Sequence, residues 1–255
     1  MKPTLTALLL GATLLASPAL AVEKAEVVKT YADIAAAGFA DSASSAQGLQ
    51  AAIDALIATP SEETLTAARE AWKTARVPYQ QTEVFRFGNA IVDDWEGRVN
   101  AWPLDEGLID YVDSDAYGGP SEENPLSTLN VIATPKFSIG ATELDATTIT
   151  VDTIRSLHEA DGIEANVASG YHAIEFLLWG QDLNGTGPGA GARPHTDYIQ
   201  GEGCTGGNCD RRAAYLKAAT DLLVTDLQEM AANWAEGGAA RDAVTSDPAS
   251  GVQAM

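Results

Sequence analysis

The chain has 255 residues and carries 36 acidic against 15 basic side chains, which gives a formal net charge of −21. Hydrophobic residues make up 45% of the sequence and charged residues 20%, which argues against general disorder and predicts one or two packed cores. The acidic balance argues against nucleic acid and anionic lipid as partners, because both are bound by clustered Lys and Arg. Cations are the small partners that such a surface favours.

Residues 1–21 have the layout of a cleaved secretory signal peptide. Lys2 precedes an apolar run over residues 5–15, and Ala19 and Ala21 form a small-residue cleavage pattern. The run is shorter than the roughly 20 residues that a membrane span needs, and no Cys follows it to accept a lipid. We therefore expect cleavage after Ala21 and export to the periplasm, without a lipid anchor.

The first part of the mature chain predicts two long helices. Apolar residues over 22–58 follow mostly helical spacing, which is interrupted near Gly38 and Gly48. A second helix is expected to start with Thr59 as its cap and Pro60 in its first position. Its apolar residues then recur at steps of three and four, as on an amphipathic helix.

The rest of the chain predicts an irregular insert followed by two more helices. Residues 88–140 are rich in Pro, Gly and Asp and show no clear period-two strands, so any helices there should be short. The segment 162–180 becomes apolar on nearly every face in its last two turns, which is typical of a buried helix. A last strong helix is expected to begin with Asn208 or Asp210 as its cap.

Together these elements predict an all-α protein of two helical-bundle domains, the second of them truncated. The first bundle, with its irregular insert, is expected over residues 22–148, and the partial second bundle over residues 149–255. Two helices cannot cover a segment that is apolar all round. Its cover must come from the first unit, from a partner chain, or from residues that would complete the second bundle, and we expect the last.

Cys204 and Cys209 are separated by four residues, two of which are glycines. Such a gap bends easily and an exported protein meets oxidants, so a local disulfide is the favoured interpretation. A two-Cys metal site is the alternative, but it needs two further ligands and none lies next to it in the sequence.

His172 and Glu175 are the strongest candidates for chemistry. They stand three residues apart in a predicted helix, so both project from one face. An ionised carboxylate is costly to bury alone, so we expect a cation, an Arg or a metal beside Glu175. His-x-x-Glu offers a nitrogen and a carboxylate to one ion, and iron with carboxylates and one His is chemically reasonable. A His–Glu hydrogen bond inside the core explains the same spacing without a metal.

A second group of polar residues lies in the predicted first bundle. Arg76 and Glu83 are seven residues apart, which is two helical turns along one face. Asp105, Glu106 and Asp110 follow in the segment WPLDEGLIDY. For each acid taken alone, a solvated surface is the simpler interpretation.

Several motifs match one known family when they are taken together. The segment GYHAIEFLLWGQD carries Gly-x-His-x-x-Glu, and AWKTARVPYQQTEVFRFG and WPLDEGLIDYV lie upstream of it. These motifs resemble those of the imelysin-like family, the group of insulin-cleaving metallopeptidases and iron-regulated protein A. The resemblance implies two helical bundles with His172 and Glu175 near their interface. It also implies that Arg76, Glu83 and Asp105 approach that site from the first bundle.

The resemblance implies an exported protein that binds iron, with zinc or another divalent metal as alternatives, in bacterial iron uptake. The metal ligands are then His172, Glu175, Glu83 and Asp105, supported by Arg76, and a membrane iron-transport component is the candidate partner. A metallopeptidase is the second hypothesis, with Glu83 as its candidate general base. A non-catalytic structural or polysaccharide-binding module is the third.

Overall fold

The computed structural model describes residues 22–120 and 122–255 of the chain. The predicted signal peptide, residues 1–21, lies outside the described residues. Within them the protein is mainly helical, which confirms the all-α prediction, with a two-stranded sheet added. No helix in this part of the chain is long and apolar enough to cross a membrane.

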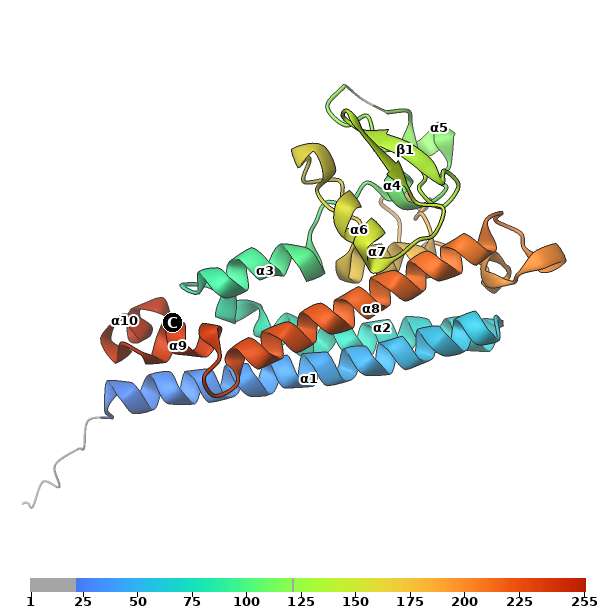
Figure 1. Cartoon of the computed structure of the whole chain (residues 1–255). Coiled ribbons are helices and arrows are strands. Elements are labelled where there is room, and N and C mark those ends of the chain that lie inside the picture. Colours follow the sequence, from blue (N-terminus) through green and yellow to red (C-terminus); the bar gives the residue numbers. More distant parts are fainter. Residues whose placement is uncertain (1–21, 121) are drawn as a thin grey trace, which may run out of the picture.

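Three long helices form the body of the protein: α1 (Lys24–Ala58), α2 (Glu62–Thr82) and α8 (Cys209–Trp234). Both α2 and α8 pack along α1, and Figure 1 shows the three helices running side by side. Buried residues recur along α1 at steps of three and four, and many of them are alanines, which let neighbouring helices approach closely.

The α1 helix runs unbroken through Gly38 and Gly48, where the apolar spacing is interrupted. A β-carbon placed on Gly38 would lie 3.1 Å from Cγ2 of Thr82, at the end of α2. Gly38 therefore serves the close approach of two helices rather than a break in one. Gly48 has no neighbour within 4 Å of such a β-carbon.

The cap of α2 is Ser61, and the prediction of Thr59 is wrong. The Ser61 hydroxyl accepts a hydrogen bond from the Thr64 N–H at 3.1 Å, and the Thr64 hydroxyl accepts one from the Ser61 N–H at 3.0 Å. This reciprocal pair satisfies two backbone donors at the start of the helix. Thr59 instead ends α1, so Pro60 belongs to the connection between the helices.

The irregular insert contains short helices and a hairpin. Its helices are η1 (Glu83–Arg86), α3 (Ala90–Asn100), α4 (Glu106–Ile109) and α5 (Ser114–Tyr117). The strands β1 (Lys136–Ile139) and β2 (Thr142–Asp145) pair antiparallel, with Phe137 opposite Leu144. We predicted no clear strands here, because strands of four residues are too short to show alternation. The turn between them begins with Gly140, whose φ is +55°.

One side chain of α8 holds this insert to the long helices. Arg211 donates hydrogen bonds of 2.6–3.0 Å to the carbonyl oxygens of Val131, Ile132, Ala146 and Thr147. These four carbonyls come from the two ends of the hairpin segment, so the guanidinium clamps both ends at once.

The remaining helices follow the hairpin in the sequence. They are α6 (Val151–Leu157), η2 (Ala160–Gly162), α7 (Gly170–Trp179), η3 (His195–Tyr198), η4 (Gly201–Gly203), α9 (Ala239–Thr245) and α10 (Pro248–Ala254). α9 and α10 fold back against α1 (Figure 1). A disulfide joins Cys204 to Cys209, the first residue of α8. Asn208, one of the two expected caps, directly precedes this helix.

The apolar helix α7 is covered by α2 and α3 from the predicted first bundle, together with α8. This is the first of the three sources of cover considered above. Buried apolar residues from 22–148 and from 149–255 also form one continuous cluster. The division of the chain into two domains therefore stays a prediction.

Candidate functional site

His172 and Glu175 lie on the one stripe of α7 that is not fully buried. The Nδ1 atom of His172 is 3.0 Å from Oε2 of Glu175, as expected for residues three apart on a helix. The side chain of His172 is 18% exposed and that of Glu175 is 42% exposed. The expectation of a buried Glu175 is therefore wrong, and water reaches its carboxylate, so its charge does not require a buried counterion.

The pair opens onto a pocket of about 540 Å³, which we call the His172 pocket. Its lining includes Trp102, Glu106, His172, Glu175, Trp179 and Asp182. The Trp102 ring lies 5.0 Å from the His172 ring, measured between centroids, and Trp102 is 70% exposed. The pocket therefore combines aromatic walls with one imidazole and three carboxylates.

Asp182 is a site residue that sequence reasoning missed, and Glu106 was expected from the sequence to be a solvated surface acid. Burial raises the pKa of Glu106, and the negative charges of Asp182 and Glu175 raise it further, while Arg193 acts in the opposite direction. The Glu106 carboxylate is thus close enough to those of Asp182 and Glu175 to be repelled by both. Asp182 follows Glu175 by seven residues, and that spacing is the signal that could have found it.

Arg76 and Glu83 do not line the His172 pocket, although the structure links them to each other. Nη1 of Arg76 donates to Oδ1 of Asn100 at 2.5 Å, and Nδ2 of Asn100 donates to Oε1 of Glu83 at 3.4 Å. Glu83 lines a separate pocket beside Phe87. The Arg76 guanidinium lies 5.1 Å from the ring centre of Tyr171, which places it against α7 but on another face.

Asp105 is also engaged elsewhere. Its carboxylate accepts hydrogen bonds from the Tyr117 hydroxyl at 3.2 Å and from Nδ2 of Asn124, and its backbone N–H donates to the Ala165 carbonyl at 2.9 Å. Asp105 thereby closes the loop before α4, while its neighbour Glu106 lines the His172 pocket.

The side chains of the His172 pocket are of the types that bind metal ions, but in this structure they are not arranged around a common point. Imidazole nitrogen and carboxylate oxygen are ligands that iron and zinc accept. Among the described residues, no group of three or more His, Cys, Asp or Glu side chains is arranged to hold a metal ion. His172 and Glu175 are in contact with each other, and Glu106 and Asp182 are the other carboxylates that line this pocket.

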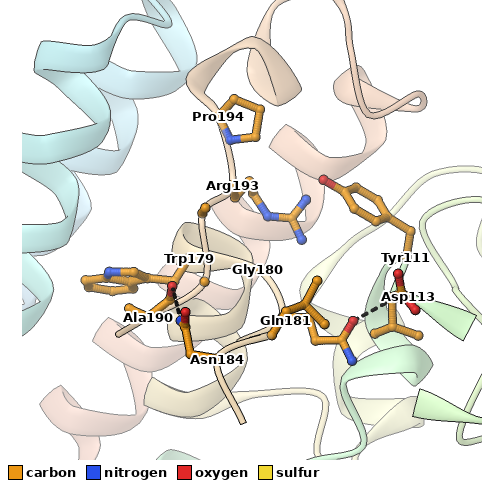
Figure 2. A pocket seen from close by; sticks show the side chains of 13 residues that line it. Tyr111, Asp113, Trp179, Gly180, Gln181, Asn184, Ala190, Arg193 and Pro194 are labelled. Carbon is orange, nitrogen blue, oxygen red and sulfur yellow. Dashed lines mark hydrogen bonds between the residues drawn. The ribbon is translucent and has the colours of Figure 1, made fainter. Parts of the chain in front are cut away.

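A second pocket of about 440 Å³, which we call the Arg193 pocket, shares a wall with the first. Its lining includes Tyr111, Trp179, Gly180, Gln181, Leu183 and Arg193, and Figure 2 shows the Arg193 guanidinium extending toward Tyr111. Trp179, Gly180, Ala190 and Gly191 line both pockets. The two pockets are therefore adjacent and share these four residues as part of their walls.

Buried ion pairs, which sequence reasoning did not identify, support this region. Asp110 pairs with Arg212 and with Arg193, and Arg193 also pairs with Asp197. All four side chains are at most 1% exposed. The Tyr111 hydroxyl donates to Asp197, and burial raises the pKa of Tyr111 to about 12.

Comparison with known proteins places these features in a family. A family model of imelysin, peptidase family M75, matches residues 35–255. An iron-regulated protein A from Synechococcus elongatus is 35% identical over 79 residues, which cover 31% of this chain and 20% of that protein. A crystal structure described as an iron-regulated protein A precursor from Parabacteroides distasonis shares the fold, with a TM-score of 0.52 and 22% identity. That match covers 86% of this chain and 47% of the other, so this chain spans less than half of either relative.

Proposed function

Since this chain belongs to the imelysin family, we propose that it binds iron, or another divalent or trivalent metal, in the His172 pocket. The observation that carries the proposal is the 3.0 Å contact between Nδ1 of His172 and Oε2 of Glu175, inside a pocket that Glu106 and Asp182 also line. The names of the two relatives support iron as the metal.

A cation in this pocket would relieve the repulsion of Glu106 by Asp182 and Glu175. The raised pKa of Glu106 reflects burial together with the charges of Asp182 and Glu175. A positive ion among these side chains removes part of that cost, and the net charge of the whole chain draws cations toward it. His172 and Glu175 would hold the ion first, and rotation of the other two side chains would add ligands.

Metal titration of the purified chain tests the proposal. Fe²⁺ is added without oxygen to chelator-treated protein, and bound metal is measured by elemental analysis after competition with a chelator of known affinity. We expect His172→Ala and Glu175→Gln each to weaken binding by about tenfold or more, because each removes a ligand of the contacting pair. Glu106→Gln and Asp182→Asn should have smaller effects in the same direction.

The surface pair His195 and Glu62 is a matched control. Its Nδ1–Oε2 distance is 3.2 Å, close to that of the proposed site, but Glu62 is 73% exposed and neither residue lines the His172 pocket. His195→Ala should leave iron binding unchanged. Full affinity in both His172→Ala and Glu175→Gln would overturn the site. Loss of binding in Glu83→Gln or Asp105→Asn would instead favour the ligand set that the family resemblance implies.

A metallopeptidase remains the second candidate, and one observation favours it. Glu106 is a half-buried carboxyl with a raised pKa beside the His172 pocket, which is a property of general acid–base residues. Hydrolysis of an unstructured peptide, measured with and without a chelator, tests this candidate. Chelator-sensitive cleavage that Glu106→Gln removes and Glu83→Gln preserves would assign the base to Glu106, and the reverse result would assign it to Glu83.

We also propose that the protein acts after export, delivering its metal to a membrane iron-transport component. The pattern of residues 1–21 supports export. Fractionation of the native cells, with N-terminal sequencing of the recovered protein, tests this part of the proposal. We expect a periplasmic chain that begins at Val22, whereas a cytoplasmic chain that begins at Met1 would contradict export.

A further inference from the structure

Among the described residues, only one of the three guanidinium nitrogen atoms of Arg193 has polar partners. Its Nη1 atom lies 2.7 Å from Oδ2 of Asp110 and donates to Oδ2 of Asp197 at 3.1 Å. Its Nε and Nη2 atoms are buried and have no hydrogen-bond partner among the described residues. Buried donors are rarely left unpaired, because they lose their water without replacement.

The neighbouring Arg212 shows what this edge of a guanidinium can bind. Its Nε and Nη2 atoms donate to the two carboxylate oxygens of Asp110, at 2.6 and 3.0 Å. Nε and Nη2 form the edge that grips a carboxylate with two parallel hydrogen bonds. In Arg193 the same edge is free, while its charge is held in place from the opposite side by Asp110 and Asp197.

A pocket lies beside the Nε and Nη2 atoms of Arg193. Arg193 lines the pocket of about 440 Å³ named after it, a volume in the range of small-ligand sites. Gly180 borders the edge, and a β-carbon placed there would lie 3.6 Å from Nε of Arg193. The centre of the Tyr111 ring lies 4.8 Å from Cζ of Arg193, and Tyr111, which lines the same pocket, is 40% exposed (Figure 2).

We propose that the Arg193 pocket binds an organic carboxylate, whose two oxygens accept hydrogen bonds from Nε and Nη2 of Arg193. The apolar body of the ligand lies against Trp179 and Leu183, which line the same pocket. Two coplanar donors match a planar carboxylate, and apolar walls favour an organic acid over inorganic phosphate, which stays more strongly hydrated. The site goes beyond the proposed metal function and does not depend on it.

Calorimetric titration of the whole chain with benzoate tests this inference, with benzamide as a neutral molecule of the same shape. We expect saturable binding of benzoate and binding of benzamide that is at least about tenfold weaker, because only the carboxylate accepts both hydrogen bonds. Arg193→Lys keeps the positive charge but removes the two-donor edge, so it should weaken benzoate binding by a similar factor. The metal-site variant His172→Ala should bind benzoate as the unmodified chain does.

A second variant keeps the test valid if Arg193→Lys does not fold. Gly180→Ala places a methyl group beside the edge and should also weaken benzoate binding. Gly185→Ala is its matched control, because both glycines have positive φ, +72° and +60°, but a β-carbon at Gly185 has no neighbour within 4 Å. Equal binding of benzoate and benzamide, no binding of either, tighter binding of inorganic phosphate, or full benzoate affinity in Gly180→Ala would each overturn the proposal.

Discussion

The backbone of Gly170, the first residue of α7, lies directly against the carbonyl group of Val99 in α3. A β-carbon placed on Gly170 would lie 2.5 Å from that carbonyl oxygen, which no real side chain allows. The φ of Gly170 is +80°, a conformation that costs a side-chain-bearing residue additional energy. This contact sets the position of the helix that carries His172 and Glu175.

We therefore expect Gly170→Ala to lower the free energy of unfolding by about 2 kcal/mol or more, through steric overlap and backbone strain. Urea denaturation followed by circular dichroism measures the change. Gly48→Ala is the control, because Gly48 lies in the middle of α1 with open space around it. That variant should be neutral or more stable by about 0.5–1 kcal/mol, since alanine favours the helix. Equal stability of the two variants would contradict the packing described here.

The buried pair of Arg212 and Asp110 should be costly to break. Arg212→Ala leaves the Asp110 carboxylate without its two-donor partner in a site that water does not reach, so we expect a loss of about 3–5 kcal/mol. Lys29→Ala removes an exposed ion pair with Asp33 and should change stability by less than about 1 kcal/mol. The two denaturation curves, measured under the same conditions, check both values. Similar small losses in the two variants would show that the buried pair is dispensable.

Arg211 should control the opening of the hairpin segment. Arg211→Ala removes four hydrogen bonds to carbonyls at the ends of that segment, so we expect faster cleavage between residues 130 and 148 in limited proteolysis. The increase should be on the order of tenfold, with the long helices still resistant. Arg155→Ala, which removes an exposed Arg of α6, is the control and should cleave at the original rate. An unchanged rate in Arg211→Ala would mean that the hairpin is held by its other contacts.

Glu106 should make stability depend on pH. Its pKa is raised in the folded protein, so the ionised carboxyl favours the unfolded chain. The penalty is absent below the pKa of the unfolded state, about 4.3, and builds up as the pH rises through the folded-state pKa. Glu106→Gln should therefore melt at a higher temperature than the unmodified chain at pH 7, and this advantage should disappear near pH 4.

Thermal melting of both proteins at the two pH values measures this difference. Glu236→Gln, which changes an exposed side chain after α8, is the control and should melt like the unmodified chain at both. A Glu106→Gln advantage of the same size at pH 4 and pH 7 would show that packing, and not the charge, is responsible.

Local pattern was enough to predict α1, α2, α7 and α8, because the apolar residues of a helix recur in adjacent turns. The steps of three and four before Ala58 correspond to α1, and the all-round apolar segment before Gly180 corresponds to α7. The strands β1 and β2 could not be found in this way, since four residues hold too little alternation.

The site could be predicted only where its residues share one element. His172 and Glu175 lie together because residues three apart share a helix face. Glu106 comes from α4 and Asp182 from the loop after α7, so only the tertiary fold brings them to the same pocket. Arg193 was missed for a different reason: an isolated Arg in a loop gives no sign in the sequence that its side chain is buried.

The backbone wall formed by Trp179, Gly180, Ala190 and Gly191 has a thermodynamic consequence. Ligands bound in the two pockets would contact the same four residues. A ligand that shifts these residues in one pocket therefore changes the shape of the other. A cation and an acid that bind there would then report on each other, and reciprocity requires that the factor by which one alters the affinity of the other be the same in both directions.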